Sequence, residues 1–255
     1  MTDFMNHTGV ALVIGGSGGI GSAICRLLSS RGSNIAFTFN KNLDKAKALQ
    51  EEIKEQKKLC IAESINLTDE SQVDQFTESL LDQGGIHTFI YAAGPTVPQL
   101  HLSKINPAQF SEHLHQEVNS FFVTVSSALP QLRDQSGSIT AVTTAATNKY
   151  VIKDGLSASP KAAVEMLIQG LAKEEGRYGI RANAVGPGML NDGMAENLME
   201  RGDYSQKDLD VATANIPLKH YGNASDIAEA VCFLASPRAN YISGQILNVD
   251  GGYTA

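Results

Sequence analysis

The sequence predicts an α/β fold with a single doubly wound parallel sheet of the Rossmann type and helices on both faces. Three observations lead to this prediction. Short apolar runs alternate with longer amphipathic segments about seven times. A glycine-rich loop joins the first apolar run to the first amphipathic segment. The 255 residues contain no linker and no internal repeat, so residues 1–255 are expected to form one domain.

Residues 10–14 form a continuous apolar run, which is typical of a strand buried on both faces. Further strands are predicted over residues 35–39, 60–65, 88–92, 138–142, 180–185 and 245–249. Helical spacing of apolar residues predicts a first helix from about residue 20 to Gly32, and further helices over 43–57, 70–83, 107–132 (one long helix or two short ones), 161–178 and 225–235. In such a sheet, ligands bind at the carboxyl ends of the strands, so functional residues are expected just after them.

Composition excludes several classes of function. The formal net charge of −7 leaves no basic surface for nucleic acid. No apolar run approaches the ~20 residues that span a bilayer, and the N-terminus does not resemble a secretory signal. Cys25, Cys60 and Cys232 are isolated in apolar segments and are interpreted as buried thiols of a reducing compartment. We therefore expect a cytoplasmic protein with a small-molecule substrate, without nucleic-acid, membrane or metal partners.

The glycine-rich loop runs from Gly15 to Gly21 with the sequence Gly-Gly-Ser-Gly-Gly-Ile-Gly. Glycine permits a tight turn and lets a pyrophosphate approach the main chain, while the helix N-terminus offers free N–H groups. The alternative is a tight structural turn. The position between a buried strand and an amphipathic helix favours dinucleotide binding by Gly15, Ser17, Gly18, Gly19, Ile20 and Gly21.

These residues resemble the TGxxxGxG motif of the short-chain dehydrogenase/reductase family, with Ile14 in place of the threonine. Further matches follow in the family's order and extend over roughly residues 8 to 252, most closely in the manner of the 3-oxoacyl-ACP reductase branch. They are Asn66-Leu67, Ala92-Ala93-Gly94, Asn119, Pro187-Gly188, and the segment from Ile216 to Gly252.

The resemblance implies a nicotinamide dinucleotide and assigns residues to it. Asn66 and Leu67 would lie beside the adenine, and Ala92, Ala93 and Gly94 would follow the fourth strand. Lys161 would hold the nicotinamide ribose, and the turn Pro187-Gly188, with Met189 and Leu190, would lie beside the nicotinamide.

The end of the second predicted strand bears on the choice between NAD and NADP. A carboxylate there would bind the ribose 2′-hydroxyl of NAD and repel a 2′-phosphate. Phe39-Asn40-Lys41 contains no carboxylate, and Asn40 and Lys41 could face a phosphate. NADP(H) is the predicted cofactor, although Gly18 stands where many NADP-binding relatives have a basic residue. An ordinary exposed charge is the alternative interpretation of Lys41.

The family's usual chemistry uses four side chains: a Tyr that donates a proton, a Lys four residues later, a Ser about thirteen residues before the Tyr, and an Asn. Lys161 and Asn119 match the Lys and the Asn. Ser157 occupies the Tyr position, and Thr144 lies thirteen residues before it (157 − 13 = 144) and can replace the Ser. The proton donor is therefore missing from its usual place.

Three explanations for the missing tyrosine stay open. Ser157-Ala-Ser-Pro-Lys161 resembles the 2,4-dienoyl-CoA reductases, in which hydride adds to a conjugated alkene; Ala146 stands where the mitochondrial branch has a separate Tyr. The hydroxyls of Thr144 and Ser157 would then stabilise an oxyanion. A relocated acid on the loop with Tyr150, Lys153 and Asp154 is the second explanation. The third is a catalytically silent NADP-binding protein or regulatory subunit.

Two further expectations concern the second half of the chain. Met189, Leu190, Met194, Leu198 and Met199 follow the Pro-Gly turn and suit a substrate lid over about residues 189–215. The helix predicted over 161–178 is apolar on more than one face. One face can cover the sheet and another can meet a second subunit, as in the four-helix interface of the family, so a homotetramer is expected.

Overall fold

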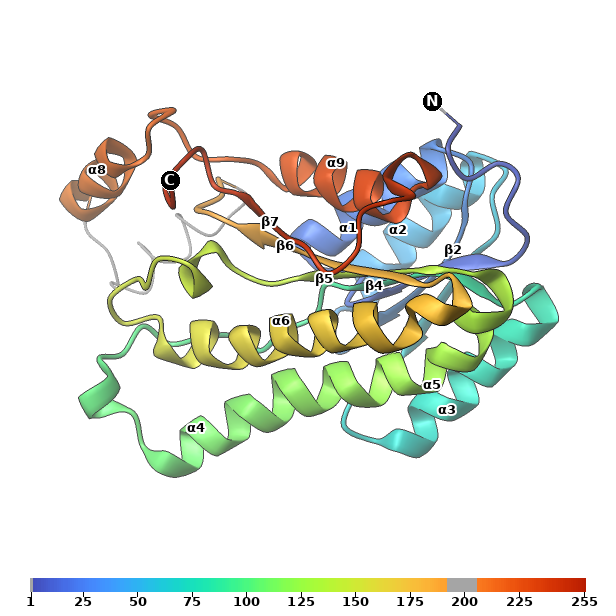
Figure 1. Ribbon diagram of the computed structural model, residues 1–255, viewed down its shortest axis with the longest axis horizontal. Helices are drawn as coiled ribbons and strands as arrows, with labels where there is room; N and C mark the ends of the chain where they lie inside the picture. Colours follow the sequence, from blue (N-terminus) through green and yellow to red (C-terminus); the bar gives the residue numbers. More distant parts are fainter. Residues whose placement is uncertain (1, 192–205) are drawn as a thin grey trace.

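Seven parallel strands form one sheet in the part of the chain that the structure, a computed structural model, describes, which is residues 2–191 and 206–255. Their order is β3-β2-β1-β4-β5-β6-β7 (Figure 1). The chain reverses its direction of travel across the sheet between β1 and β4, and such a switch point is where open α/β sheets bind ligands. The strands are β1 (Val10–Ile14), β2 (Asn34–Phe39), β3 (Cys60–Ser64), β4 (Ile86–Tyr91), β5 (Ser138–Val142), β6 (Arg181–Pro187) and β7 (Ile246–Val249).

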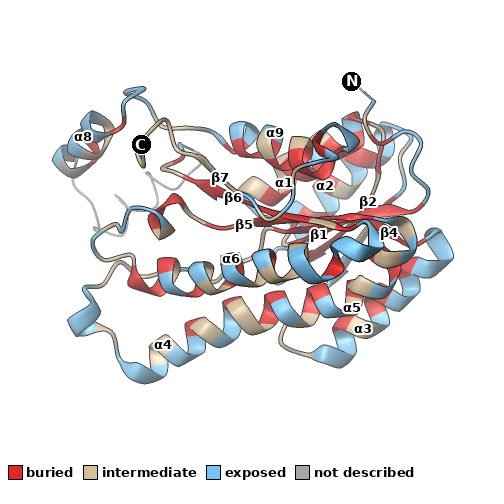
Figure 2. Cartoon of the chain, in the orientation of Figure 1, coloured by how far each residue is buried: buried red, intermediate tan, exposed pale blue. Residues whose placement is uncertain are grey.

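All seven predicted strands are present, and the predicted fold class is confirmed. The predicted bounds of β1 and β5 coincide with the structure because every residue of these strands is buried. β6 extends to Pro187, two residues beyond the predicted end at 185. Figure 2 shows the sheet as the most deeply buried layer of the molecule. Helices cover both of its faces, which explains why β1, β4 and β5 are buried at every residue.

The helices form two layers (Figure 1). One layer packs on the side of the sheet that carries Val13 and Phe37, and it contains α1 (Gly19–Ser30), α2 (Leu43–Glu55) and α9 (Ala224–Ala235). The other packs on the side of Leu12 and Phe89, and it contains α3 (Glu70–Ser79), α5 (Ser120–Gln135) and α6 (Gly155–Glu175). The remaining described helices are α4 (Pro107–Leu114), before α5, and α8 (Gln206–Asn215).

Side-chain caps fix the start of several helices. The side chains of Asn42, Asp69 and Asn106 accept backbone N–H groups at the first turns of α2, α3 and α4. Asn223 and Asp226 form a reciprocal capping box, so α9 begins at Ala224, one residue before the predicted start. These caps satisfy N–H groups that have no partner within the helix.

The segment predicted as one long helix or two short ones contains both helices and a junction. α4 ends at Leu114, a π-helical turn covers His115–Asn119, and α5 continues to Gln135. The buried hydroxyl of Tyr91 donates a hydrogen bond to the backbone oxygen of Glu117, at 3.1 Å. This bond ties the end of β4 to the wide turn.

α6 starts at Gly155, earlier than the predicted start at residue 161. Pro160 therefore lies inside the helix, where it removes one backbone hydrogen bond. Burial of Leu156, Ala158 and Pro160 against the rest of the molecule offsets that loss. The longer helix places Ser157 and Lys161 on successive turns of one element.

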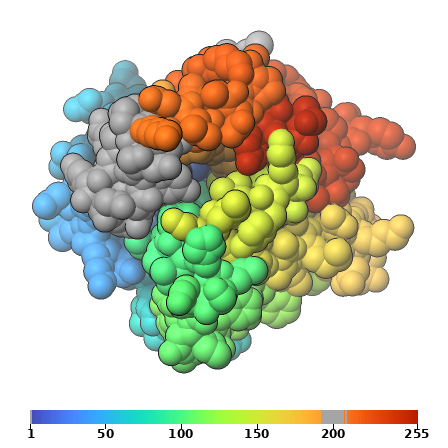
Figure 3. Space-filling view, turned by 90° about the vertical axis from the view of Figure 1, so that its left-hand side faces the viewer, coloured from blue at the N-terminus to red at the C-terminus, as the bar shows by residue number. Residues whose placement is uncertain are grey.

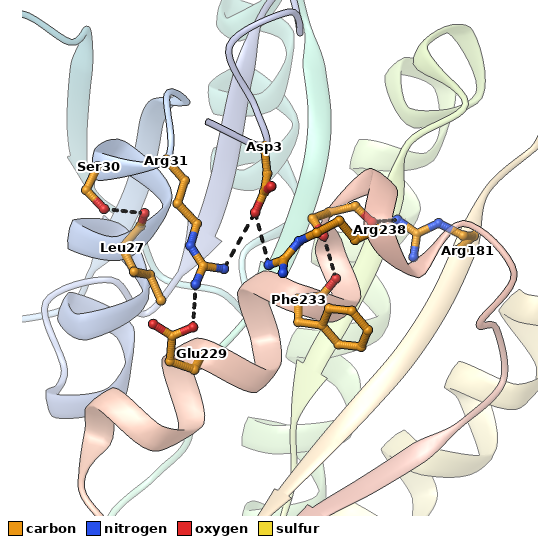
Figure 4. Close-up of polar contacts among 9 residues, drawn as sticks. Asp3, Leu27, Ser30, Arg31, Arg181, Glu229, Phe233 and Arg238 are labelled. Carbon is orange, nitrogen blue, oxygen red and sulfur yellow. Dashed lines mark hydrogen bonds and ion pairs between the residues drawn. The ribbon is translucent and has the colours of Figure 1, made fainter. Parts of the chain in front are cut away.

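The N-terminal segment is fastened across α1 and α9 by ionic contacts (Figure 4). Oδ2 of Asp3 lies 3.8 Å from Nη1 of Arg31, at the end of α1, and 3.1 Å from Nη2 of Arg238, beyond α9. Arg31 also pairs with Glu229 of α9. Phe4 is fully buried, and its N–H donates to the backbone oxygen of Arg31. The segment thus fixes α1 and α9 to each other at the end of the sheet opposite the glycine loop.

Candidate functional site

A cavity of about 400 Å³ opens at the carboxyl ends of β1, β2, β3 and β4. Several predicted cofactor residues line it: Gly15, Ser17, Gly18, Asn40, Asn66, Leu67, Ala92, Ala93 and Gly94. Figure 3 views the molecule from this end, and the surface there is hollowed between α8 (orange) and the segment around residues 145–155 (yellow-green). The sequence-derived residues from four separate strand ends therefore meet around one cavity.

The glycine-rich loop is tightly fixed at the floor of this cavity. Gly15 has φ +82°, and a Cβ atom there would lie 2.8 Å from the Cα of Ala93 on the neighbouring strand end. The N–H of Gly15 donates to Oγ1 of Thr38 at 3.0 Å, and the N–H of Gly16 donates to the backbone oxygen of the same residue. Sequence reasoning did not assign Thr38 to the site, although it precedes the end of a predicted strand.

The first turn of α1 is suited to a phosphate group. Its N-cap, Gly18, supplies no side-chain hydrogen bond, and the turn contains no acidic residue. The N-terminal N–H groups and the positive end of the helix dipole therefore face the cavity without a competing anion. Gly19, Ile20 and Gly21 form this turn, and a Cβ at Gly21 would lie 2.2 Å from the oxygen of Gly15. The residues present thus fit a dinucleotide pyrophosphate.

The end of β2 is polar and carries no carboxylate. Asn40 lines the cavity, and the Ser64 hydroxyl donates to its backbone oxygen at 2.9 Å. Lys41, the next residue along the chain, is exposed. Among the residues that line the cavity, Glu112 of α4 carries the one carboxylate. Its side chain accepts a hydrogen bond from Gln116 of the π-helical turn. A phosphate group near Lys41 would therefore not be repelled by a carboxylate on β2.

A buried ion pair lies beside the loop that follows β4. Nζ of Lys161 is 2.9 Å from Oε1 of Glu117, and the two side chains are 16% and 5% exposed. A Cβ at Gly94 would lie 3.0 Å from the other carboxylate oxygen and 3.5 Å from Nζ, so Gly94 packs closely against the pair. Sequence reasoning missed Glu117; a charged residue on the inner side of a predicted helix was the available signal.

Asn119 lies at the end of the same π-helical turn and is partly buried. Its side chain makes no hydrogen bond to another residue within the described part of the chain. Glu117, two residues earlier, is the side chain that the turn brings to Lys161.

Thr144 and Ser157, the two predicted hydroxyl donors, stand on either side of the β5–α6 connection. Thr144 follows β5, and its Oγ1 accepts the N–H of Ala146 at 3.2 Å. Ser157 is partly buried on the first turn of α6, one turn before Lys161. The Thr144 hydroxyl proton is not used in the contact with Ala146, so it is free to be donated to an incoming oxygen.

Glu165 locks the end of β5 against α6. Its carboxylate accepts hydrogen bonds from the hydroxyls of Thr143, at 2.7 Å, and Thr147, at 3.0 Å. Burial raises the pKa of Glu165, and the two hydroxyls partly oppose that rise. Thr143 and Thr147 flank Thr144, so this network fixes the backbone from which Thr144 projects.

Comparison with known proteins identifies the arrangement. A family model described as enoyl-(acyl carrier protein) reductase matches residues 15–254. The chain belongs to the short-chain dehydrogenase/reductase family. The family predicted from the glycine loop and the later motifs is confirmed, and the match begins directly after β1 and extends past the end of β7.

Individual relatives of this short-chain dehydrogenase/reductase agree. The 3-oxoacyl-[acyl-carrier-protein] reductase FabG of Staphylococcus epidermidis is 32% identical over 244 residues, or 95% of this chain and 97% of that protein. A blue fluorescent protein from a metagenomic library, solved in complex with NADPH, has a TM-score of 0.88 and 30% identity over 99% of this chain and 100% of its own. The chain is therefore a short-chain oxidoreductase.

A third relative is an NADPH-bound short-chain oxidoreductase from Pseudomonas aeruginosa PAO1, described as containing an atypical catalytic center. Its TM-score is 0.87 and its identity 26%, over 96% of each chain. NADP(H), the cofactor predicted from the sequence, is thus the one bound in both of these solved relatives.

The loop between β5 and α6 carries Tyr150, Lys153 and Asp154, the residues considered for a relocated acid in this short-chain dehydrogenase/reductase. Tyr150 is half exposed, and its hydroxyl lies beside the start of α6, 3.2 Å from where a Cβ of Gly155 would stand. Burial raises the pKa of Asp154 to about 6, although hydrogen bonds from Gln99 and Ser157 and the charge of Lys161 act in the opposite direction. Asp154 is partly buried, whereas Tyr150 is half exposed.

The residues expected at the nicotinamide end follow β6. Pro187 pairs with Val249 of β7, and a Cβ at Gly188 would lie 2.7 Å from the Cα of Asp250. Leu190 is buried, and Met189 is partly buried. Of the predicted lid, Met194, Leu198 and Met199 lie outside the described residues. Pro187 and Gly188 are not among the residues that line the cavity of about 400 Å³.

Other features of the described residues bear on function. No helix among them is long and apolar enough to cross a membrane. In the same described residues, no group of three or more His, Cys, Asp or Glu side chains is placed to hold a metal ion. Cys25, Cys60 and Cys232 are free and buried, and burial raises the pKa of each thiol.

Proposed function

We propose that this protein is an NADP(H)-dependent reductase that saturates the conjugated double bond of an enoyl- or dienoyl-type acyl thioester. The observation that supports this most directly is the placement of Ser157, in the position of the usual phenol, one turn before Lys161 on α6, with Thr144 directly ahead of the short helical turn that follows β5. A serine hydroxyl is a far weaker acid than a tyrosine phenol. It suits the stabilisation of an oxyanion better than the direct delivery of a proton.

NADP(H) is proposed from the cavity at the strand ends. Gly15 and the first turn of α1 would hold the pyrophosphate, and Asn66 and Leu67 would contact the adenine. Lys41, with no carboxylate beside it on β2, would face the 2′-phosphate. Pro187, Gly188, Met189 and Leu190 would border the nicotinamide. When bound, the reduced nicotinamide supplies a hydride.

The residues of the chain supply orientation and electrostatic stabilisation. Lys161 would hold the ribose, and Glu117 would orient the Lys161 ammonium group through their 2.9 Å contact. Thr144 and Ser157 would donate hydrogen bonds to the thioester oxygen as negative charge develops on it. Gly94 would let the substrate and cofactor approach this pair closely. Asn119 and Tyr150 are secondary candidates for hydrogen bonding at the same site.

A second candidate is reduction of a 3-oxoacyl thioester. The FabG relative, at 32% identity over nearly the whole chain, favours it. The same oxyanion donors would serve, but a ketone needs an efficient proton donor at the oxygen. Ser157→Tyr should raise ketone reduction if this candidate is only latent, because it restores the phenol one turn before Lys161.

The remaining expectations concern assembly. We propose one domain over residues 1–255, a homotetramer and a cytoplasmic location. Met166 on α6 and Phe122 on α5 are 66% and 56% exposed, so apolar side chains remain on the outer surface of both helices. The three free thiols agree with a reducing compartment. In the tetramer α5 and α6 would meet their counterparts in a second subunit.

The test is NADPH oxidation by the purified protein with three substrates: a dienoyl thioester, an enoyl thioester and a 3-oxoacyl thioester. We expect turnover of a conjugated thioester to exceed that of the 3-oxoacyl thioester. Brisk ketone reduction that Tyr150→Phe abolishes would replace the proposal with a relocated tyrosine acid. Tight NADPH binding without turnover of any thioester would establish a catalytically silent protein instead.

A further inference from the structure

Residues 250–254, which follow β7 directly, form a turn that is organised by one carboxylate. Oδ1 of Asp250 accepts the N–H of Gly252 at 2.9 Å, and Oδ2 accepts the N–H of Thr254 at 2.9 Å and its hydroxyl at 2.6 Å. The side-chain amide of Asn248, on β7, donates to the same hydroxyl oxygen at 3.1 Å. These hydrogen bonds anchor the turn to the end of the strand.

The turn contacts two segments at the nicotinamide end of the site. A Cβ at Gly188 would lie 2.7 Å from the Cα of Asp250, so the Pro-Gly turn and residues 250–254 pack backbone to backbone. The N–H of Leu218, on the stretch after α8, donates to the backbone oxygen of Gly251 at 3.2 Å. The turn therefore supports the expected border of the nicotinamide and the stretch that follows the predicted lid.

Lys149 joins the β5–α6 connection to this turn. Its Nζ donates to the backbone oxygen of Tyr253 at 2.8 Å and lies 4.6 Å from the centre of the Tyr253 ring. Both contacts favour an ammonium group, because the oxygen carries a partial negative charge and so does the face of the ring. The backbone N–H of Lys149 donates to the oxygen of Ala145 at 3.3 Å, and Ala145 directly follows Thr144. The Lys149 side chain is thus linked to Thr144 through one backbone hydrogen bond.

The backbone of Thr144 is held from its other side by β6. A Cβ at Gly186 would lie 3.1 Å from the carbonyl carbon of Thr144 and 2.5 Å from Oδ1 of Asn248 on β7. β6 pairs with β7, and β7 leads into the turn that Lys149 contacts. The contacts therefore close a ring that runs from Thr144 through β6, β7 and residues 250–254 to Lys149 and back to Thr144.

The Lys149 contact is the part of this ring that can be removed without opening the core. Glu165 is buried and holds the hydroxyls of Thr143 and Thr147. Lys149 lies two residues beyond Thr147, and it is exposed. Its substitution should therefore loosen the connection after Thr147 while the hydrogen bonds of Glu165 remain.

We propose that Lys149 is a positioning residue of this reductase, which keeps the Thr144 hydroxyl directed at the substrate oxygen by holding the β5–α6 connection against Tyr253. The inference rests on the proposed function, in which Thr144 donates a hydrogen bond to the thioester oxygen as negative charge develops on it. A donor displaced by about an ångström stabilises that charge much less, so the expected loss is one of turnover. Neither Lys149 nor Tyr253 lines the dinucleotide cavity, so cofactor affinity should stay the same.

The test compares wild type with Lys149→Met, Lys149→Arg, Thr144→Val and the double variant of Lys149→Met with Thr144→Val. Steady-state kinetics use NADPH and whichever thioester, conjugated or 3-oxoacyl, the wild type reduces faster, and fluorescence titration gives the NADPH affinity. Lys149→Met should lower kcat about tenfold, with KM and NADPH affinity within about twofold of wild type. Lys149→Arg should keep most of the rate, because a guanidinium can make the same charged hydrogen bond and ring contact.

The double variant tests the route through Thr144. Its kcat should equal that of Thr144→Val, because the hydroxyl that Lys149 positions is already gone. Lys58→Met is the matched control: Nζ of Lys58 also donates to a backbone oxygen, that of Gly32 at 2.7 Å, but just before β2 at the amino ends of the strands. This variant should keep the wild-type kcat.

Two outcomes would overturn the inference and leave the proposed function intact. One is a kcat for Lys149→Met within twofold of wild type, and the other is a full additional loss when Lys149→Met is combined with Thr144→Val. A wild type that binds NADPH but reduces no thioester would overturn the proposed function and this inference together.

Discussion

The Nζ atom of Lys161 lies 2.9 Å from Oε1 of Glu117, and this contact joins α6 to the π-helical turn between α4 and α5. Both side chains are largely buried. Each charge therefore depends on the other, because an unpaired ion in this environment has lost its water and gained nothing in return. The pair also lies where a cofactor ribose is proposed, so the position of the Lys161 ammonium group is set before any ligand arrives.

We predict strong coupling between these two residues. Lys161→Met and Glu117→Gln should each lower the free energy of unfolding by about 3–5 kcal/mol, because each leaves or weakens one side of a buried pair. The double variant should recover a large part of that loss. Denaturant unfolding of the two single variants and the double variant measures the coupling. Arg26→Met, which breaks the exposed pair with Glu52, is the control and should change stability by about 0–1 kcal/mol. Additive losses would contradict coupling.

Lys41 should determine the choice of cofactor. Wild type should bind NADPH more tightly than NADH, because β2 ends without a carboxylate and is followed by the exposed Lys41. Lys41→Ala should weaken NADPH binding by about tenfold, the effect of ~1.4 kcal/mol, and leave NADH binding nearly unchanged. Fluorescence titrations with both cofactors provide the measurement. Lys47→Ala, an exposed lysine on α2, is the matched control. Equal wild-type affinities would rule out this role.

The Thr144 hydroxyl should matter for turnover rather than for stability. Thr144→Val keeps the side-chain shape but removes the donor to the developing oxyanion, so kcat should fall by about 10²–10³-fold. Thr140→Val on β5 is the control, because the buried Thr140 hydroxyl has no hydrogen-bond partner in the structure. Steady-state kinetics of both variants with a conjugated thioester decide the matter. A kcat for Thr144→Val within twofold of wild type would exclude Thr144 from the reaction.

Met166 should contribute to subunit assembly. Its side chain is 66% exposed on α6, where a large apolar group gains stability only if a partner covers it. Met166→Asp should shift the particle mass from four chains toward two or one in multi-angle light scattering. Leu81→Asp, at a position with 57% exposure elsewhere on the molecule, should leave the mass unchanged. A wild-type monomer at micromolar concentration would refute the tetramer.

His87 should make the fold sensitive to acid. Burial, and secondarily the nearby His7, lower the pKa of His87 to about 3. The unfolded chain takes up a proton below about 6.5, whereas the folded protein keeps this ring neutral until about pH 3. Stability is therefore lost as pH falls through 6.5, by up to ~1.4 kcal/mol per unit.

His87→Gln should abolish that part of the loss, although it also disturbs the contacts of the ring with Ser33 and Thr88. The measurement is the difference in unfolding free energy between pH 7 and pH 5, not the absolute value at either pH. His101→Gln, at an exposed position, should retain the wild-type difference. An unchanged difference in His87→Gln would show that another group governs the acid response.

The strands were predictable because their physical cause is local. A run such as Val10–Ile14 is apolar at every position, and only burial on both faces accommodates it. The start of α6 was not predictable in the same way. Pro160 is normally a signal that a helix begins after it, and the burial of Leu156 and Ala158 that overrides this signal is a tertiary effect.

The site divides along the same line. Gly15, Asn66 and Ala93 follow strands, so the sequence places them at one edge of the sheet and the structure brings them to one cavity. Glu117 could not be found this way. Regular helical periodicity assigns a side chain a direction only while the turns stay regular, and the turn His115–Asn119 is not α-helical. Asp154 was named from its loop, but its place at the N-cap of α6 depends on where that helix starts.

The π-helical turn has a consequence for how this site can change. A π-turn is an α-helix that holds one additional residue, so removing one residue from His115–Asn119 would restore an unbroken helix from Pro107 to Gln135. Each residue of an α-helix rotates the next by ~100°. A deletion of Val118 would therefore turn everything on its N-terminal side, Glu117 included, by about that angle relative to α5 while leaving the sequence of α5 untouched. Deletion of one residue would thus move Glu117 away from Lys161 and place a different side chain beside it.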